Sequence, residues 1–461
     1  MMKRLVWKWA NLFSPSYRQF RRAMAIWSKA GPAEAAAGSA VRLHHYLVYC
    51  RTYSPYWRKR WPPEAEQFTP GEAEQVLALL PPLTKAQLRE HRDEIRILPS
   101  LRRPSDGFPT IREQRTVKSG GSTGIPVEVF ADRHFGDCNR ATIDFFYELC
   151  HLAPGKQFFF IWGSPNELLD LKSNWKKRLS SRLRGMHALP AFRLTPEKIL
   201  GIAHTIAKRR HIDSAICFAS AAETLMEFAE HQGLRLRRLR RVFVGGGMLH
   251  DRLRERLQRH WADDVYNVYG SRDLGVMAHE TPQHDGLVVP DWFNRVEVLD
   301  QHGRRVAPGD KGEVHVTALC NYSSALIRVA MGDTARWQPA PEGGSLPGPR
   351  LTELGGRIVE HLIGPGGVII DPSAIIHLLG VVIAPAWLRK FQLIQRAESH
   401  FELLAEAWGE LPDHQQREQL RARLQAELGN LVKSSVKIEL SLVDEIPLLP
   451  SGKHQYCVKA F

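Results

Sequence analysis

The sequence predicts an α/β fold: a large N-terminal α/β domain with parallel sheets and helices, followed by a small mobile C-terminal α+β domain. Between residues 158 and 268, short apolar runs alternate with amphipathic stretches, as parallel strands and their covering helices do. Beyond residue 286 the pattern becomes strand, turn, strand, which favours antiparallel pairing. The 461 residues are 43% hydrophobic and 24% charged, which suits a globular chain.

Periodicity predicts where the individual elements lie. Ile199, Ile202 and Ile206 show helical spacing, whereas apolar runs of four or five residues are typical of buried strands. The expected strands are residues 158–162, 215–218, 242–244 and 265–268, and the expected helices are residues 196–209, 222–229 and 251–261. Residues 296–299 and 313–317 flank a turn and are expected to pair antiparallel.

Breaks in the pattern divide the chain into three expected regions. Residues 1–80 form an N-terminal helical region with a helix at 40–49, and residues 81–355 form the large domain. A second helix, at 85–95, is expected at the start of the large domain, after two prolines. Residues 356–461 form the small domain, with a polar helix at 413–428 and a strand at 436–442.

Charge and cysteine usage narrow the function classes. The chain has 63 Lys and Arg against 49 Asp and Glu, a net charge of +14 that suits nucleic acid, anionic membranes or phosphorylated small molecules. Nucleic-acid binding is not expected, because the basic residues are spread out and no recognition motif is present. The six cysteines are scattered without a CxxC pair, so disulfide scaffolds and zinc ribbons are not expected. A reducing, cytoplasmic location is expected instead.

The first 25 residues leave two alternatives open. The segment MMKRLVWKWANLF is basic and aromatic but lacks the apolar core and cleavage site of a signal peptide. An interfacial helix would place Lys3, Arg4 and Lys8 against lipid phosphates at the inner membrane surface. The other alternative is a first helix packed on the protein. No apolar stretch approaches the ~20 residues that cross a bilayer.

The most informative segment is residues 116–130, TVKSGGSTGIPVEVF. Glycines let backbone N–H groups turn toward an anion, and hydroxyl groups add donors without bulk. The segment therefore has the composition of a phosphate-binding loop. It is not a Walker loop, because no Lys-Ser/Thr pair follows the last glycine. A plain surface turn is the alternative reading of the loop alone.

The loop SGGSTGIP resembles the signature loop of the adenylate-forming superfamily, which includes acyl-CoA synthetases, peptide-synthetase adenylation domains and luciferases. Five further segments resemble motifs of this superfamily, and they occur along the chain in the same order as in the superfamily. They are VFVGGG at 242–247, Tyr269-Gly270-Ser271-Arg272-Asp273, LIRVAMGD at 326–333, Gly356-Arg357 followed by Glu360, and Pro450-Ser451-Gly452-Lys453.

The resemblance implies an enzyme that activates a carboxylic acid with ATP and Mg²⁺. The implied nucleotide-binding residues are Ser119, Gly120, Gly121, Ser122, Thr123, Gly124, Gly246, Gly247, Tyr269, Gly270, Ser271, Asp333 and Arg357. Asp273 would hold Mg²⁺, Glu360 would form the interdomain hinge, and Lys453 would bridge the attacking carboxylate and the α-phosphate. A flexible point charge such as Lys suits that last role.

Within the superfamily, PLTKAQLREH at 82–91 and the YGSRD segment look most like the phenylacetate–CoA ligase branch and its CapK, or coenzyme F synthetase-like, subgroup. Two residues depart from the usual pattern. Asp273 stands where Glu is usual, so its reach toward Mg²⁺ is shorter by one methylene. Glu360 stands where Asp or Lys is commoner, but it keeps a carboxylate.

The acceptor and the acid remain open at this stage. The resemblance implies acyl transfer to a thiol, either coenzyme A or a carrier protein, whereas an amine acceptor or a polysaccharide-pathway intermediate is the alternative. The run Arg235, Arg237, Arg238, Arg240 and Arg241 would meet CoA phosphates or form a solvated face. Phe145, Phe146, Tyr147, Phe159, Phe160 and Trp162 would line an aryl or acyl pocket or fill the core. A non-catalytic membrane-docked scaffold is the remaining rival class. The sequence does not predict the oligomeric state.

Overall fold

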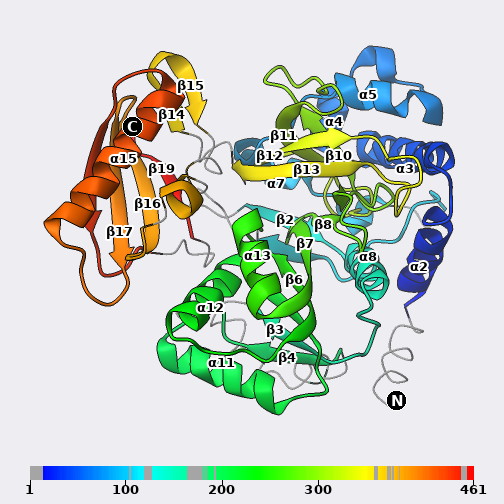
Figure 1. Cartoon of the computed structure of the whole chain (residues 1–461). Helices are drawn as coiled ribbons and strands as arrows, with labels where there is room; N and C mark the ends of the chain where they lie inside the picture. The colour runs from blue at the N-terminus through cyan, green and yellow to red at the C-terminus, as the bar shows by residue number, and fades with distance from the viewer. Residues whose placement is uncertain are drawn as a thin grey trace.

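The computed structural model describes residues 14–102, 105–118, 127–162, 179, 181, 184–191, 194–357, 362–370, 375, 378–383, 385–447 and 454–461. These residues form a large N-terminal domain and a small C-terminal domain that lies to one side of it (Figure 1). The predicted α/β class, with a small α+β domain at the C-terminus, is confirmed.

One sheet of eleven strands runs through the large domain, in the order β10-β11-β12-β13-β9-β8-β7-β6-β5-β3-β4. The strands from β4 to β7 are parallel, as the alternating pattern predicts. They are β3 (Phe158–Ile161), β4 (Met186–Leu189), β5 (Ser214–Phe218), β6 (Leu239–Gly245) and β7 (Ala262–Ser271). All five residues of β5 are buried, which explains its continuous apolar run.

Three helices cover one face of this parallel half: α11 (Pro196–Lys208), α12 (Ala219–His231) and α13 (Asp251–His260). Ile199, Ile202 and Ile206 of α11 are all buried there, as their spacing predicts. The other face packs on the end of α8 (Arg133–Leu149), where Tyr147 lies against Phe243. Parallel strands are stable only when both faces are covered in this way.

The remaining strands of the large sheet are antiparallel. They are β8 (Gly275–His279), β9 (Leu287–Val288), β10 (Arg295–Leu299), β11 (Lys311–Thr317), β12 (Val329–Gln338) and β13 (Arg350–Arg357). The predicted pairing of residues 296–299 with 313–317 is confirmed in β10 and β11. A separate hairpin, β1 (Arg115–Lys118) with β2 (Glu128–Ala131), flanks the predicted phosphate loop.

The N-terminal helices share one core with the antiparallel half. They are α2 (Pro15–Trp27), α3 (Pro32–Tyr53), α4 (Pro55–Arg60), α5 (Ala73–Leu79), α6 (Lys85–Glu90) and α7 (Arg92–Ile95). The single helix expected at 85–95 is wrong: His91, at φ −103° and ψ 23°, separates α6 from α7. Helix α2 buries Tyr17, Phe20 and Met24 and contacts α8. The described part of the first 25 residues therefore packs on the protein.

Short 3₁₀ segments complete the large domain at Pro63–Ala65, Pro70–Glu72 and Pro99–Leu101. Among the described residues, every helix is too short or too polar to cross a membrane.

The small domain has its own four-stranded sheet in the order β18-β17-β16-β19, packed on one helix. These elements are β16 (Leu388–Ala397), β17 (His400–Ala407), α15 (His414–Val432), β18 (Lys437–Leu442) and β19 (Cys457–Lys459). A hairpin of β14 (Leu362–Gly364) and β15 (Val368–Ile370), joined by the 3₁₀ segment Pro365–Gly367, lies above them, and a π-helix at Leu378–Ile383 follows it in the chain. The predicted helix and strand are both present, although α15 runs four residues further.

A buried arginine ties the N-terminal helices to the antiparallel strands. The Arg328 side chain is 2% exposed and donates to the carbonyl oxygens of Leu80 and Gly303 at 2.7 Å. It also donates to Glu297 Oε2 at 3.1 Å, and the Glu297 side chain is 3% exposed. Burial raises the pKa of Glu297, and Arg328 opposes that rise. The pair is therefore held as buried charges that compensate each other.

We expect Arg328→Ala to lower the free energy of unfolding by about 3–5 kcal/mol, because it leaves Glu297 buried without its principal cation. Guanidinium unfolding followed by tryptophan fluorescence measures the change. Arg304→Ala is the matched control, since Arg304 is 74% exposed and pairs with Asp300 at the surface. Equal small effects of both substitutions would show that the buried pair does not stabilise the domain.

Candidate active site at the sheet edge

The carboxyl ends of the parallel strands meet at one edge of the large sheet. Phe218 pairs with Gly245, and Gly245 pairs with Val268, so these three residues form one row across β5, β6 and β7. Gly246 follows the end of β6 at this edge, and Tyr269 follows Val268 within β7, where it pairs with Ala278 of β8. Ligands of open α/β sheets bind at this edge.

The turn after β6 needs glycine for steric reasons. Gly246 has φ +73°, and a Cβ atom there would lie 2.2 Å from the Phe218 ring. The Phe218 ring in turn stacks on Trp162 with 4.0 Å between centroids. A Cβ on Gly247 would lie 3.0 Å from Ala219 Cβ. The backbone at Gly246 and Gly247 therefore packs too closely on Phe218 and Ala219 to carry side chains.

Tyr269 and Asp333, which lie far apart in the sequence, meet beside this turn. The Tyr269 hydroxyl donates to Asp333 Oδ2 at 2.7 Å, and Tyr269 is 9% exposed. Asp333 lies on β12 directly after Gly332, whose φ angle is +77°. One residue earlier, the Met331 carbonyl oxygen accepts a hydrogen bond from Lys85 Nζ at 2.8 Å. The structure brings these two predicted residues together.

The backbone of Arg357 lies next to Asp333. The two residues are register partners in the antiparallel pair of β12 and β13. Close by, burial raises the pKa of Glu313, Lys85 opposes that rise, and Asp333 adds to it. A carboxylate pair and a lysine therefore act on one another at this end of β12.

A tight reversal joins β7 to β8 and carries the remaining predicted residues. Ser271 pairs with Gly275, and the Leu274 N–H donates to Ser271 Oγ at 3.2 Å. A Cβ on Gly270 would lie 2.8 Å from the Gly275 carbonyl oxygen, so the two strands approach too closely for a side chain there. Asp273 is the central residue of this turn.

Two asparagines hold this reversal from outside. Asn139 Oδ1 on α8 accepts the Val276 N–H at 3.0 Å. Asn294 Nδ2 donates to the carbonyl oxygens of Leu274 and Val276 at 2.8 and 2.9 Å. The sequence analysis missed both residues, since a lone Asn far from the motif carries no signal. Both are positioning residues for the turn.

Asp273 fits a magnesium ligand. It is 5% exposed, and its Oδ1 atom is buried without a hydrogen-bond partner among the described residues. A buried carboxylate oxygen left without a donor is costly unless a ligand satisfies it. Carboxylate oxygen is the donor that Mg²⁺ prefers.

Several predicted residues lie outside the described part of the chain. They are Ser119, Gly120, Gly121, Ser122, Thr123, Gly124, Glu360 and Lys453, and the side chain of Arg357 belongs with them. Their roles stay predictions.

The aromatic group and the basic run, which the sequence analysis left open, are divided between the core, the sheet edge and the surface. Phe146 and Phe159 are fully buried in the core, and Trp162 stacks on Phe218 at the edge described above. In the basic run, Arg237 donates to the Ile206 carbonyl oxygen, and Arg241 donates to the His151 carbonyl oxygen at 2.9 Å. Arg238 and Arg240 pair with Asp263 and Asp213.

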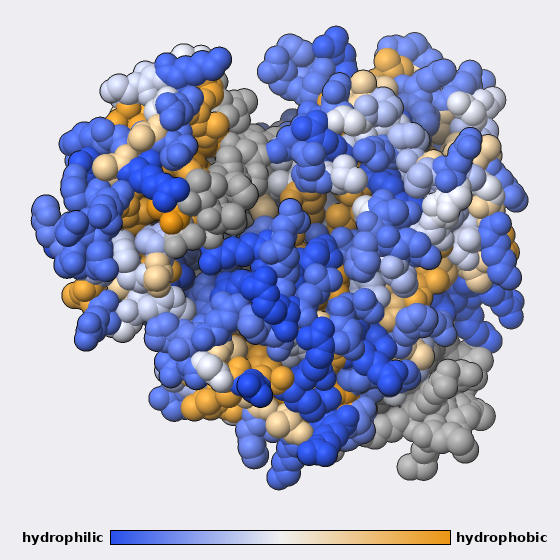
Figure 2. Space-filling view, viewed as in Figure 1, coloured by the Kyte–Doolittle hydropathy of each residue, from blue (hydrophilic) through white to orange (hydrophobic). Residues whose placement is uncertain are grey.

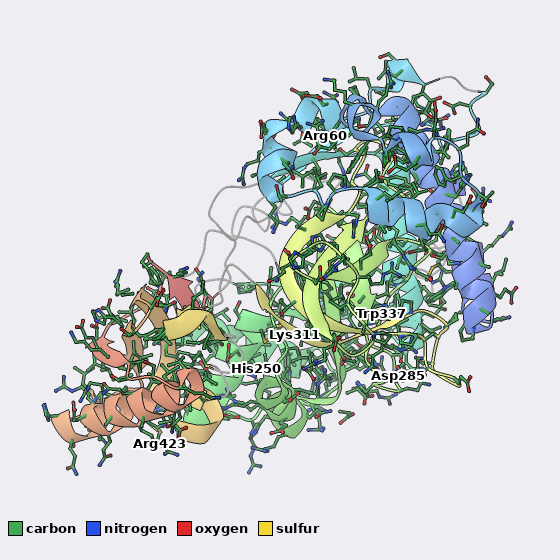
Figure 3. All side chains as sticks on the ribbon, turned by 90° about the horizontal axis from the view of Figure 1, so that it is seen from above. Arg60, His250, Asp285, Lys311, Trp337 and Arg423 are labelled. Carbon is green, nitrogen blue, oxygen red and sulfur yellow. The ribbon has the colours of Figure 1, made fainter. Side chains whose placement is uncertain are left out.

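A cleft of about 1290 Å³ separates the two domains beside this edge. It is lined by Met248, Leu249 and His250, which directly follow the glycine turn, and by Arg389 and Lys390 of β16. Figure 2 shows hydrophilic surface on the large domain along this groove. In Figure 3, His250 lies on the side of the large domain nearest the small domain.

Two direct contacts between described residues cross the cleft. The Tyr456 hydroxyl, just before β19, donates to Glu223 Oε2 on α12. The His231 ring at the end of α12 stacks on Trp408, with 4.4 Å between centroids and 12° between ring planes. The sequence analysis missed these residues as well, because they meet only when the domains are placed together.

Glu223 and Glu227, one turn apart on α12, have opposite pKa shifts. Burial alone would raise the pKa of Glu223, but His250 and Tyr456 hold it well below the ordinary value. Burial and the neighbouring Glu223 raise the pKa of Glu227 to about 8. The charged and titratable groups that act on the pair come from both domains and include His250, Arg256, Arg389, Lys390 and His454.

Two parts of the chain match known protein families. Residues 189–322 match the AMP-binding enzyme family, and residues 362–460 match the CapK C-terminal domain. No curated protein matches the chain by sequence.

Solved structures share the fold across almost the whole chain. The 2-hydroxyisobutyryl-CoA ligase bound to its acyl-adenylate in the postadenylation state has a TM-score of 0.70 at 19% identity, over 93% of this chain and 90% of that one. The same enzyme in the thioesterification state has a TM-score of 0.55 at 19% identity, over 94% and 91%. ATP-bound MatB from Rhodopseudomonas palustris has a TM-score of 0.51 at 15% identity, over 74% and 66%. The chain has the fold of adenylate-forming enzymes, and with the two family matches this fold supports an ATP-dependent ligase.

The domain contact is expected to weaken as pH rises. With the two domains docked (the closed state), burial and Glu223 raise the pKa of Glu227 to about 8 from its ordinary 4.5, and we expect separation of the domains to expose Glu227 and lower this pKa. The closed state therefore binds the extra proton, and its stability falls between about pH 4.5 and pH 8 as that proton is lost. Small-angle X-ray scattering should show a larger radius of gyration at pH 8.5 than at pH 6.

Glu227→Gln should abolish most of this change in radius, since the amide stays neutral. Glu255→Gln is the matched control, because Glu255 lines the same cleft but is exposed. A radius that is equal at both pH values in the unsubstituted chain would exclude the titration of Glu227 as a domain switch.

Proposed function

We propose that this protein activates a carboxylic acid with ATP, forming an acyl-adenylate and pyrophosphate, and then transfers the acyl group to a thiol such as coenzyme A. The observation that carries this proposal is the meeting of Tyr269 and Asp333 beside the Gly246 turn. At the carboxyl edge of a parallel sheet, an aromatic ring suits the base of a nucleotide and a carboxylate suits its ribose. Glycine backbone without side chains lets the nucleotide approach closely.

The proposed roles follow from the chemistry of each group. Asp333 would accept hydrogen bonds from the ribose hydroxyl groups, and the Tyr269 ring would stack on the adenine. The backbone at Gly246 and Gly247 would lie along the nucleotide. Arg357 would join Asp333 at the ribose, and the backbone register of the two residues supports this role.

The transition state of adenylation gathers negative charge on the α-phosphate oxygens, so positioning and cationic stabilisation dominate catalysis. We assign this stabilisation to Lys453, and the binding of the β- and γ-phosphates to the loop Ser119–Gly124. Mg²⁺ would be held by Asp273 and would neutralise phosphate charge. The Leu274 and Val276 backbone contacts with Asn294 and Asn139 would keep Asp273 in place.

The domain arrangement supports the adenylation half of the reaction. The TM-score is higher to the postadenylation form than to the thioesterification form of the same ligase, which supports a small domain docked as it is in a ligase that holds its acyl-adenylate. Transfer to the thiol would then require release of the Tyr456–Glu223 and Trp408–His231 contacts. The acid is proposed to be an aryl or acyl carboxylate, with Trp162 and Phe218 as an apolar wall of its pocket, within a phenylacetate–CoA ligase-like branch.

Carboxylate-dependent exchange of pyrophosphate into ATP tests the function directly. A panel of aryl, fatty and sugar acids should give exchange with one class, and Lys453→Ala should lower that exchange on the order of 10²–10³-fold by removing the cation at the α-phosphate. ATP binding by the variant should change little. Exchange by Lys453→Ala at the unsubstituted rate would refute the lysine assignment.

Trapping the product with CoA, a pantetheine-bearing carrier protein or an amine separates the possible acceptors. Thioester formation with CoA supports the proposed second step, whereas turnover with the amine alone would replace it.

Asp273→Asn should raise the Mg²⁺ concentration at half-maximal exchange by at least about tenfold, since the amide carries no charge to hold the cation. Asp263→Asn is the matched control, because Asp263 lies at the opposite end of β7 and pairs with Arg238 at the surface. If the two variants titrate alike with Mg²⁺, Asp273 does not ligate the metal.

A further inference from the structure

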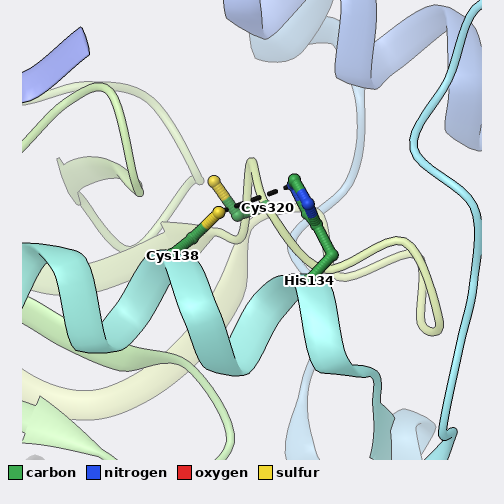
Figure 4. A group of neighbouring side chains, drawn as sticks. All are labelled: His134, Cys138 and Cys320. Carbon is green, nitrogen blue, oxygen red and sulfur yellow. Dashed lines mark hydrogen bonds between the residues drawn. The ribbon is translucent and has the colours of Figure 1, made fainter. Parts of the chain in front are cut away.

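Three soft ligand side chains meet inside the large domain, away from the candidate active site. His134 and Cys138 lie one turn apart on α8, and Cys320 reaches them from the segment that follows β11 (Figure 4). Their ligand atoms all lie within 4.8 Å of one another. Among the described residues this is the one group of three or more His, Cys, Asp or Glu side chains that meets that condition.

The spacing of these atoms matches a tetrahedral metal site. With Zn–S and Zn–N bonds of about 2.3 and 2.05 Å, the sulfur and nitrogen ligands of one ion lie about 3.6 Å apart, and two sulfur ligands lie about 3.8 Å apart. The distance from Cys138 Sγ to His134 Nε2 is 3.5 Å. Cys320 Sγ lies within the 4.8 Å limit of both. Small rotamer adjustments would therefore suffice to bind an ion.

The surroundings of His134 favour ligation through Nε2. Nδ1 of His134 lies 3.2 Å from the Ser16 hydroxyl oxygen. The Nδ1–H tautomer donates to that oxygen and leaves the Nε2 lone pair facing the sulfur atoms. The Tyr322 ring packs edge-on against the imidazole, with 5.5 Å between centroids. Metal-binding imidazoles are commonly oriented by such a bond at the other nitrogen.

The surroundings of Cys320 favour a thiolate. Arg42 Nη2 donates to Cys320 Sγ at 3.2 Å, and Arg42 Nε donates to the Trp292 carbonyl oxygen at 2.8 Å. The guanidinium therefore lies fixed against the sulfur and stabilises negative charge on it. Two thiolates and a divalent ion sum to zero charge, so the buried cluster would gain no net charge beyond that of Arg42.

We propose that His134, Cys138 and Cys320 bind one Zn²⁺ ion. Zn²⁺ suits a nitrogen and two sulfur ligands, and three protein ligands leave the fourth tetrahedral position to a water molecule. Any thiol proton is released to solvent when the ion binds, and no electron is transferred. Cys138 and Cys320 are both fully buried, so the bound ion would link α8 to the segment before β12 inside the domain.

Metal analysis of the full chain, purified without chelator and dialysed, tests the site. We expect inductively coupled plasma mass spectrometry to find about one equivalent of zinc per chain, and less than about a tenth of that amount in Cys320→Ser. Cys150→Ala is the matched control, since Cys150 is equally buried at the end of the same helix and should leave the zinc content unchanged. Circular dichroism confirms that each variant is folded.

A second measurement needs no variant. Co²⁺ added to the chelator-treated chain should produce the thiolate-to-cobalt absorption in the near ultraviolet, and Zn²⁺ should abolish it. Zinc should also raise the midpoint of thermal unfolding of the chelated chain. Absence of both zinc and the cobalt band would overturn the proposal. So would four rather than six titratable thiols in denaturant without reductant, which would mark Cys138 and Cys320 as a disulfide pair.

Discussion

The site depends on the reversal between β7 and β8, where the large sheet changes from parallel to antiparallel. Because β7 pairs in parallel with β6 and antiparallel with β8, its chain must turn back at the very edge where the parallel strands end. The close approach of Gly270 to Gly275 makes that turn tight enough to keep Tyr269 and Asp273 at one edge. A wider loop would carry Asp273 away from the glycine turn after β6.

The antiparallel half contributes to the site only because it is held to the parallel half. The bond from Tyr269 to Asp333 joins β7 directly to β12, although β8, β9 and β13 separate the two strands in the sheet order. Farther along, the buried Arg328 joins β12 to the N-terminal helices through main-chain carbonyl oxygens. The N-terminal helices therefore support the geometry of Asp333, and Lys85 of α6 adds a direct bond to the Met331 carbonyl oxygen two residues before it.

Sequence reasoning succeeded where a local pattern determines the structure. The spacing of Ile199, Ile202 and Ile206 and the apolar runs of the parallel strands predicted the helices and the sheet. The motif resemblance singled out Tyr269 and Asp333, and the fold brings these two residues together. His91 shows the limit, since nothing around it in the sequence marks a break in the helix. Asn139, Asn294 and the pair Tyr456–Glu223 could not be predicted, because their roles come from contacts between distant segments.

The same helix links the proposed zinc cluster to the reversal. Cys138 and Asn139 are consecutive on α8: Cys138 turns toward His134 and Cys320, whereas Asn139 accepts the Val276 N–H beyond the turn. An ion bound to Cys138 and Cys320 would fix α8 against the segment that leads into β12, and so fix Asn139 relative to both Asp273 and Asp333. Rigid placement of the two carboxylates would then come from the core beneath the site, which leaves the small domain free to dock and release above it.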